Sequence, residues 1–224
     1  MYPAFASWSG GKDCCLALNT AKFEGIDVRY LFNMVSEDGQ RSRSHGIRAA
    51  VIKQQAEALG IPILQQPTTD DAYEEVFIKA LKGFKQEGIE MGIFGDIDFE
   101  PHREWIERVC KPADITPYLP LWQADQLQLV EEFITTGYKA IVIAVRADLM
   151  GKEFLGRTLD YTLIADIAAL NKDITPCGEA GEFHTLVIDG PIFEKRLELT
   201  KTEIVTRMEH HFLEILATEL KDNK

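Results

Sequence analysis

Long apolar runs are missing from this sequence of 224 residues, and its N-terminus shows no basic segment followed by an apolar one. A bilayer-spanning helix needs about 20 apolar residues, so we expect neither a membrane span nor a signal peptide, and we expect a cytoplasmic location. Basic residues are also scarce, with 24 Lys and Arg against 36 Asp and Glu and a net charge of −12. This negative surplus repels nucleic acid, so an RNA substrate would need a local basic patch.

Cysteine pairs with metal-site or redox spacing are absent too. The four cysteines are Cys14, Cys15, Cys110 and Cys177, and they contain no Cys-x-x-Cys motif. This spacing disfavours a zinc ribbon or finger and a disulfide framework. It fits free thiols in a reducing compartment.

Two common nucleotide-binding patterns are missing, the P-loop and Gly-x-Gly-x-x-Gly. The sequence has instead a Gly-pair loop, Ser9-Gly10-Gly11-Lys12-Asp13-Cys14, between an expected strand over 4–8 and an expected helix over 13–24. Glycines let a phosphate approach the backbone, and the N–H groups and dipole of a helix N-terminus attract negative charge. Lys12 adds a positive charge, and Asp13 offers a carboxylate that caps the helix or holds Mg²⁺ through water. The alternative is an ordinary turn with a helix cap.

Strands and helices are expected to alternate along the first half of the chain. The apolar patterns predict strands over 28–35, 62–65 and 91–94 and helices over 46–59, 70–88 and 100–110. Such alternation is typical of a parallel sheet with crossover helices, in which ligands bind beyond the carboxyl ends of the strands. The loops 9–13, 36–46 and 95–103 are therefore expected to converge.

A proline-rich stretch over 111–122 marks a change of character, and we place a domain boundary there. The predicted domains are 1–114 and 115–224. In the second domain we expect helices over 125–136, 158–170 and 209–221 and strands over 140–145, 186–189 and 195–206. The fold class is α/β, with a parallel-sheet first domain and a smaller α/β second domain.

A second group of polar residues follows the expected strand 91–94. Gly95 and Asp96 stand at its end, and the next helix carries Arg103 and Arg108, which can hold a phosphate or a substrate carboxylate. Arg108 has an alternative role as the ion-pair partner of Glu104, four residues earlier.

A third group lies in the segment Cys177-Gly178-Glu179-Ala180-Gly181-Glu182-Phe183-His184. Two glycines flank two carboxylates, which indicates a tight loop entering a strand. Glu179 and Glu182 can bind an amine, act as a general base or help to hold a metal. The alternative is a polar hairpin turn, which needs the glycines but not the paired acids.

The loop Ser9–Cys14 resembles the PP-loop, Ser-Gly-Gly-x-Asp-Ser, of enzymes that split ATP between its α and β phosphates. Together with further segments, the chain resembles the diphthine–ammonia ligase family almost from end to end. These segments are Gly95–Ile97, Arg103–Cys110, Pro117–Trp122, Gly137–Ala140, Cys177–Thr185 and Asp189–Phe193.

The resemblance implies a HUP-type, Rossmann-like ATP-binding domain and a smaller substrate domain. It implies that a substrate carboxylate attacks ATP, that pyrophosphate leaves, and that ammonia displaces AMP to give an amide. Lys12, Glu179 and Glu182 would be catalytic, and Mg²⁺ would assist. ATP would contact Ser9, Gly10, Gly11, Lys12, Asp13, Cys14, Gly95 and Asp96, and the acceptor would contact Arg103, Arg108, Cys177, Gly178 and His184. The expected partners are ATP, ammonia and a carboxylate on a protein side chain or a cobalamin-related small molecule, with a homodimer as one assembly and no membrane.

Two positions depart from the family pattern. Cys14 replaces the usual Ser, and His184 stands where the diphthamide branch usually has an acidic residue, which resembles a mostly bacterial branch associated with cobalamin salvage. Two other functions stay open. A tRNA-thiolating PP-loop enzyme would need a persulfide cysteine and an RNA surface, and a non-catalytic nucleotide-binding module would need no Glu179–Glu182 loop.

Overall fold

A computed structural model describes residues 2–170 and 172–223. The chain divides into two compact units. The first comprises Met1–Ser9 and Asp13–Gln123, and the second comprises Gly10–Lys12 and Ala124–Lys224. Within the described ranges, none of the helices combines the length and apolar character that crossing a bilayer demands.

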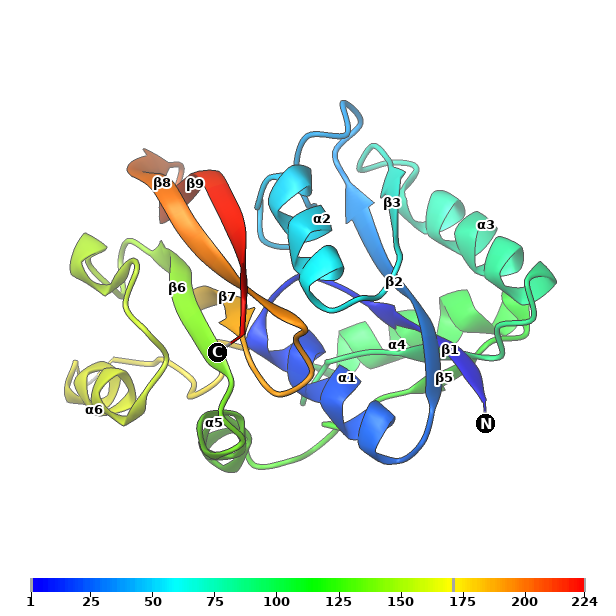
Figure 1. Cartoon of the computed structure of the whole chain (residues 1–224), viewed down its shortest axis with the longest axis horizontal. Coiled ribbons are helices and arrows are strands. Elements are labelled where there is room, and N and C mark those ends of the chain that lie inside the picture. Colours follow the sequence, from blue (N-terminus) through cyan, green and yellow to red (C-terminus); the bar gives the residue numbers. More distant parts are fainter. Residues whose placement is uncertain (1, 171, 224) are drawn as a thin grey trace. The chain divides into compact units, whose positions relative to one another are not determined.

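The first unit is built on a five-stranded parallel sheet, which confirms the predicted α/β class (Figure 1). Its strands are β1 (Pro3–Ser7), β2 (Asp27–Val35), β3 (Ile63–Pro67), β4 (Met91–Ile93) and β5 (Thr116–Tyr118). The strand order is β3-β2-β1-β4-β5, so the direction of winding reverses between β1 and β4. In open α/β sheets, ligands bind at the carboxyl ends of the strands at such a reversal. The loops after β1 and β4 therefore form the expected ligand edge.

Four helices connect these strands: α1 (Lys12–Phe23), α2 (Ala49–Ala58), α3 (Tyr73–Gln86) and α4 (Glu100–Cys110). Helices α3 and α4 cover one face of the sheet, where Phe77, Phe84 and Ile106 pack in one core with Phe5 and Phe32. Figure 1 shows α1 and α2 on the opposite side. Alternating crossover helices bury both faces of a parallel sheet, which explains why β1 is almost wholly apolar.

The proline-rich stretch after α4 adds a strand that the sequence did not predict. A short 3₁₀ helix, η1 (Lys111–Ala113), leads into β5, which pairs with β4. Residues 115–123, placed after the boundary on sequence grounds, thus belong with the first unit. Pro117 fits there because β5 is an edge strand with hydrogen-bond partners on one side only.

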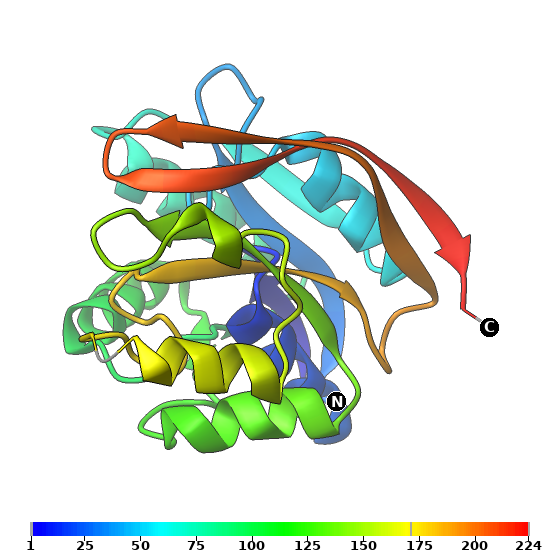
Figure 2. The same cartoon turned by 90° about the vertical axis from the view of Figure 1, so that its left-hand side faces the viewer.

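The second unit contains an antiparallel sheet with the strand order β7-β6-β9-β8. Its elements are α5 (Gln126–Thr135), β6 (Lys139–Arg146), η2 (Lys152–Phe154), α6 (Tyr161–Ala169), β7 (Phe183–Asp189), β8 (Lys195–Arg207) and β9 (His210–Asp222). Both α-helices start at an aspartate whose carboxylate accepts a backbone N–H of the first turn, Asp125 from Gln128 and Asp160 from Leu163. Figure 2 shows the long β8–β9 hairpin in orange to red.

The helix predicted over 209–221 is wrong, because this segment is strand β9. It pairs with β8 from Lys195–Asp222 to Arg207–His210, and its first residues also pair with β6. Met208 at the hairpin turn has a positive φ of 48°. The segment's own propensity permits a helix, but cross-strand pairing with a 13-residue partner supplies more contacts than an isolated helix would.

Candidate functional site

The loop between β1 and α1 is the first part of the candidate site. Gly10 has a φ of +85°, a conformation that favours glycine, and α1 begins two residues later. Ser9 Oγ donates a hydrogen bond to Cys14 Sγ over 3.3 Å, so the cysteine that replaces the family's serine accepts a bond from the loop. Asp13 lies in the first turn of α1. The predicted strand–loop–helix arrangement is therefore present.

Gly95, just beyond β4, approaches the first turn of α1 very closely. A Cβ atom at this position would lie 2.7 Å from the backbone nitrogen of Cys14 and 2.8 Å from the carbonyl carbon of Asp13. Backbone atoms cannot move away as a flexible side chain can, so glycine is required here. The loops after β1 and β4 therefore meet at the reversal point of the sheet, as the sequence predicted.

Asp96 follows Gly95 in the loop after β4, and Arg103 lies on helix α4 that this loop leads into. Asp96 Oδ1 lies 3.1 Å from His102 Nδ1, in the first turn of α4. Arg103 donates through Nε to Glu107 Oε1 over 2.9 Å, and its guanidinium carbon lies 5.2 Å from the centre of the Trp122 ring. Arg103 thus lies near the carboxyl ends of the strands, and Glu107 binds only one side of its guanidinium.

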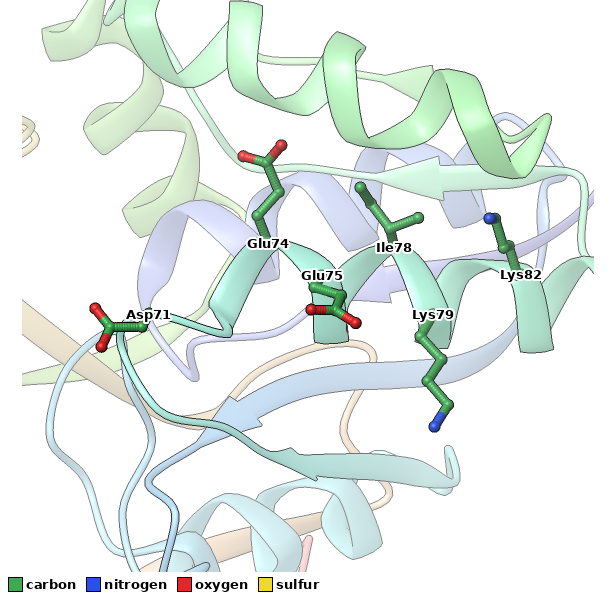
Figure 3. Close-up of a pocket in the computed structure, with 6 residues that line it drawn as sticks. All are labelled: Asp71, Glu74, Glu75, Ile78, Lys79 and Lys82. Carbon is green, nitrogen blue, oxygen red and sulfur yellow. The ribbon is translucent and has the colours of Figure 1, made fainter.

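Arg108 is occupied elsewhere. Its Nη2 donates to Glu74 Oε2 over 2.8 Å, and its Nε donates to Glu74 Oε1 over 3.3 Å. These bonds lower the pKa of the Glu74 carboxyl and raise that of the guanidinium. The partner is on α3, not at Glu104, so Arg108 ties two helices together. Glu74 also lines an open hollow of about 580 Å³ along α3, which contains none of the predicted site residues (Figure 3).

Lys12 lies in the second unit, where it is 4% exposed. Its ammonium donates to the carbonyl oxygen of Cys177 and lies 5.4 Å from the centre of the Phe183 ring. Its backbone N–H donates to Thr185 Oγ1 over 3.1 Å, and the Gly10 carbonyl accepts from Val187 N over 3.0 Å. The centre of the Gly-pair loop (residues 9–14) is therefore bound to strand β7.

Glu182, directly before β7, is the more enclosed of the two predicted acids. It is 1% exposed, and its Oε1 accepts from the backbone nitrogen of Thr175 over 2.7 Å. Its Oε2 is buried without a hydrogen-bond partner among the described residues. A carboxylate held by one oxygen, with the other uncommitted, is suited to accept a proton.

Glu179 lies in the turn that precedes Glu182 and is half-buried. Its backbone nitrogen donates to Thr175 Oγ1 over 2.9 Å, so Thr175 holds both the turn and the Glu182 carboxylate. Gly178 has a φ of +68°, and a Cβ there would lie 2.6 Å from the Phe183 carbonyl oxygen. The glycines thus make the tight loop that the sequence predicted.

His184 is neutral near pH 7. Burial, the positive charge of Lys12 and the neighbouring His210 lower its pKa from 6.5 to about 4. In the sheet, His184 of β7 pairs with Ala144 of β6, and Ala144 pairs on its other side with Phe212 of β9. An uncharged imidazole can donate one hydrogen bond and accept another, but it gives no counter-charge to a ligand.

The cysteines are buried. Cys177 donates its backbone N–H to Gln126 Oε1 and its thiol to the Gln126 carbonyl, which fixes the carbonyl that Lys12 contacts. Burial raises the pKa of the Cys110 thiol to about 12 and raises that of Cys15 well above its usual value. These two thiols are protonated at neutral pH and poorly suited to nucleophilic chemistry.

In the described part of the chain, no group of three or more His, Cys, Asp or Glu side chains is arranged to hold a metal ion. Mg²⁺ in nucleotide sites usually takes one or two carboxylates together with the phosphates and water. The Asp13 carboxylate, in the first turn of α1, fits that limited role.

Several residues of the site were not predicted from the sequence. Thr185 and Phe183 contact Lys12, Thr175 holds Glu182, and Gln126 holds Cys177. Each contact joins positions that local patterns do not connect. The one available signal was the geometry of a strand. Successive side chains point to opposite faces, so a strand over 183–187 places Phe183 and Thr185 on the same face.

Two family models match the chain. The diphthamide synthase N-terminal domain matches residues 3–117, and the diphthamide synthase C-terminal domain matches residues 125–220. The chain is 31% identical over 235 residues to a diphthine–ammonia ligase of Schizosaccharomyces pombe, with 95% of this chain and 38% of that protein covered. It therefore spans well under half the length of that relative.

Shorter relatives are covered more fully. A Danio rerio diphthine–ammonia ligase is 28% identical over 227 residues, with 91% of this chain and 89% of that protein covered. The Homo sapiens protein of the same name is 27% identical, with 88% and 82% covered. A solved structure described as a predicted subunit of a tRNA methyltransferase from Methanocaldococcus jannaschii aligns with a TM-score of 0.45 and 14% identity over 88% of this chain and all of that one. That likeness is too distant to bear on function.

Proposed function

From the premise that this chain belongs to the diphthamide synthase family, we propose that it is an ATP-dependent amide ligase that forms AMP and pyrophosphate. It adenylates a substrate carboxylate and transfers the acyl group to ammonia. The observation that carries the proposal is that Lys12, in the Gly-pair loop of residues 9–14, is bound to the segment that contains Glu182. The loop that carries a group for the leaving phosphates is thus in contact with the segment that contains a candidate base.

The first step is attack of the substrate carboxylate on the α-phosphorus of ATP, with departure of pyrophosphate. The backbone N–H groups at the start of α1 offer donors to the phosphates, and Gly95 lets the loop after β4 pack directly against this helix start. Lys12 supplies positive charge near the departing pyrophosphate. When bound, Mg²⁺ supplies further charge neutralisation at the phosphates, with Asp13 as its candidate ligand.

The second step is attack of ammonia on the acyl carbon, with departure of AMP. Ammonia must be neutral to attack, and the nitrogen must lose a proton as the amide forms. Glu182 is the favoured base because Thr175 fixes one of its oxygens and the other has no partner among the described residues. Glu179 is less enclosed and serves better at orienting the incoming amine.

The identity of the acceptor is part of the proposal. The relatives are named for diphthine. His184, uncharged near pH 7, offers the acceptor a neutral hydrogen-bonding imidazole. We keep diphthine as the first substrate to test and a carboxylate on a small molecule as the second. A cytoplasmic location and a homodimer stay predictions from the sequence.

Thiol chemistry, the alternative from the sequence, finds little support. The raised pKa values of Cys15 and Cys110 disfavour the thiolate that a persulfide carrier needs. The Cys177 thiol is engaged with the Gln126 carbonyl. Amide formation is therefore favoured over thiolation.

The test is a product analysis. The protein is incubated with ATP, ¹⁵N-ammonium and either a diphthine-bearing protein or the same protein with an unmodified histidine. We expect AMP and pyrophosphate, and ¹⁵N in an amide of the diphthine-bearing sample alone. ADP as the main product would overturn the assignment of the cleaved bond. AMP and pyrophosphate without ¹⁵N in the amide would leave the adenylation in place and exclude diphthine as the acceptor.

A further inference from the structure

Trp122 is the one tryptophan of three whose indole N–H has no acceptor among the described residues. Trp8 Nε1 donates to Gln55 Oε1 over 2.7 Å, and Trp105 Nε1 donates to Glu74 Oε2 over 3.1 Å. Trp122 Nε1 is buried and has neither kind of partner. A buried donor without an acceptor costs free energy, and it is rare enough in native proteins to call for an explanation.

Arg103 lies over the same ring, with its guanidinium carbon 5.2 Å from the ring centre. Within the described chain, Arg103 uses Nε towards Glu107 and the face of its guanidinium towards the indole. The side chain is 39% exposed and therefore has room to turn. The indole N–H and the guanidinium N–H groups are a few hydrogen-bond donors next to an apolar ring. Such a small number of donors suits a carbonyl or carboxylate oxygen better than a whole phosphate group.

The position of this pair points to the same reaction. Gln123 N donates to the Ile97 carbonyl over 2.7 Å, and Ile97 stands two residues beyond Gly95, which approaches the backbone of Cys14. Contacts within the first unit thus connect the segment that contains Trp122 to the start of α1. Gln123 itself has a φ of +60°, a strained value for a residue with a side chain. Strained backbone next to an unpaired donor is typical of ligand sites.

We infer that Trp122 Nε1 and the guanidinium of Arg103 bind the acyl oxygen of the acceptor, beside the adenylate at the ends of β1 and β4. This role rests on the proposed function and adds Trp122 as a residue that recognises the acyl group. The nucleotide phosphates use the N-terminus of α1, whereas the acyl oxygen uses the indole. Because Nε1 is enclosed in the described state, Arg103 or the turn over Leu119–Trp122 must move when the ligand binds.

The experiment compares two ligands that share the nucleotide and differ in the acyl part. One is AMP, and the other is 5′-O-(N-acetylsulfamoyl)adenosine, a stable mimic of an acyl-adenylate. Their dissociation constants are measured by calorimetry for the full chain, for Trp122→Phe and for Trp105→Phe. Trp122→Phe keeps a ring beneath Arg103 and removes only the N–H. Trp105→Phe removes an N–H that already has a partner, and it is the matched control.

We expect wild type to bind the mimic more tightly than AMP. Trp122→Phe should reduce that preference about tenfold, which corresponds to the loss of one hydrogen bond, while AMP binding stays unchanged. Trp105→Phe should leave the preference unchanged. The mimic should also change the tryptophan emission of wild type and of Trp105→Phe but not of Trp122→Phe. Arg103→Gln should reduce the preference too, and it serves if Trp122→Phe does not fold.

The outcomes separate two failures. If wild type binds AMP and the mimic equally, the proposed acyl-adenylate chemistry fails. If wild type prefers the mimic and Trp122→Phe and Arg103→Gln keep the full preference, the chemistry stands and the role of Trp122 is wrong.

Discussion

The ammonium group of Lys12 donates a hydrogen bond to the carbonyl oxygen of Cys177, 165 residues later in the chain. Lys12 is buried, and its backbone N–H donates to the Thr185 hydroxyl. A lysine ammonium has three donors, so this bond leaves it able to serve another acceptor. The residue thus has a structural partner as well as its proposed role at the phosphates.

Replacing Lys12 by Met tests both roles. Loss of a positioned charge at a leaving group typically lowers the rate of the chemical step about 10²- to 10³-fold, and we expect this for pyrophosphate release. The Cys177 carbonyl loses its donor, so the free energy of unfolding should also fall by about 1–3 kcal/mol. Lys22→Met, at an exposed position of the same helix, should change neither. A Lys12→Met variant with a normal rate would remove Lys12 from the mechanism.

Replacing Gly95 by Ala should push the end of β4 away from α1. The added Cβ would lie 2.7 Å from a backbone nitrogen, so we expect a loss of about 1–3 kcal/mol in stability and at least a tenfold weaker affinity for ATP. Gly83→Ala in α3 is the control, because nothing lies within 4 Å of its Cβ position. It should raise stability by about 0.5–1 kcal/mol. Calorimetry and urea unfolding give both quantities, and unchanged ATP affinity in Gly95→Ala would contradict the site.

Replacing each of the two acids of the 175–185 loop should affect a different step of the reaction. Glu182→Gln keeps an oxygen for the Thr175 N–H, so the fold should hold, but it cannot take a proton. We expect amide formation to fall about 10²- to 10⁴-fold while ATP affinity stays near normal. Glu179→Gln should raise the ammonia concentration needed for half-maximal rate and lower the maximal rate less. Single-turnover kinetics distinguishes the steps, and the reverse ranking would make Glu179 the base.

His184 should make the protein less stable in mild acid. Its folded pKa of about 4 lies below the ordinary histidine pKa of 6.5, so between these pH values the unfolded chain binds a proton that the folded chain does not. The free energy of unfolding should therefore fall as the pH drops from about 6.5 towards 4, by up to about 3 kcal/mol. Urea unfolding of wild type and His184→Gln across this range measures the difference. Equal pH dependence in both proteins would show that another group is responsible.

Gln123→Gly should stabilise the protein. The residue has a φ of +60° and is exposed, so the change relieves a left-handed conformation that costs a residue with a Cβ roughly 1–2 kcal/mol. Part of this gain is offset by the greater freedom of glycine in the unfolded chain, which leaves about 0.5–1 kcal/mol. Gln128→Gly, at an exposed position of α5, should instead cost about 1 kcal/mol. Thermal unfolding of both variants decides the sign.

Local patterns predicted the first unit well, because its signals are local. The apolar strand before Ser9 depends only on near neighbours in the chain. Parallel-sheet topology then follows from alternation alone, and it brings Gly95 beside α1 without further information. The acids of the 175–185 loop could likewise be selected from their glycine spacing.

What the sequence missed depends on distant partners. Glu104 was offered for Arg108 because it stands one helical turn away, but Glu74, 34 residues earlier, binds it instead. The apolar positions of 209–221 predict a helix as readily as a strand, and only the pairing of β9 with β8 decides between them. The segment Pro117–Trp122 resembles the family, but no pattern within it distinguishes Trp122, since an unpaired indole N–H is defined by what surrounds it.

The assignment of Gly10–Lys12 to the second unit has a consequence for how this protein can be divided. A gene cut after Gln123 would yield an N-terminal fragment that keeps Lys12 and a C-terminal fragment that has lost the donor to Cys177 and Thr185. The two fragments are therefore not interchangeable cassettes. Chimeras between relatives should exchange 10–12 together with 124–224, and recombination that separates these segments should be selected against.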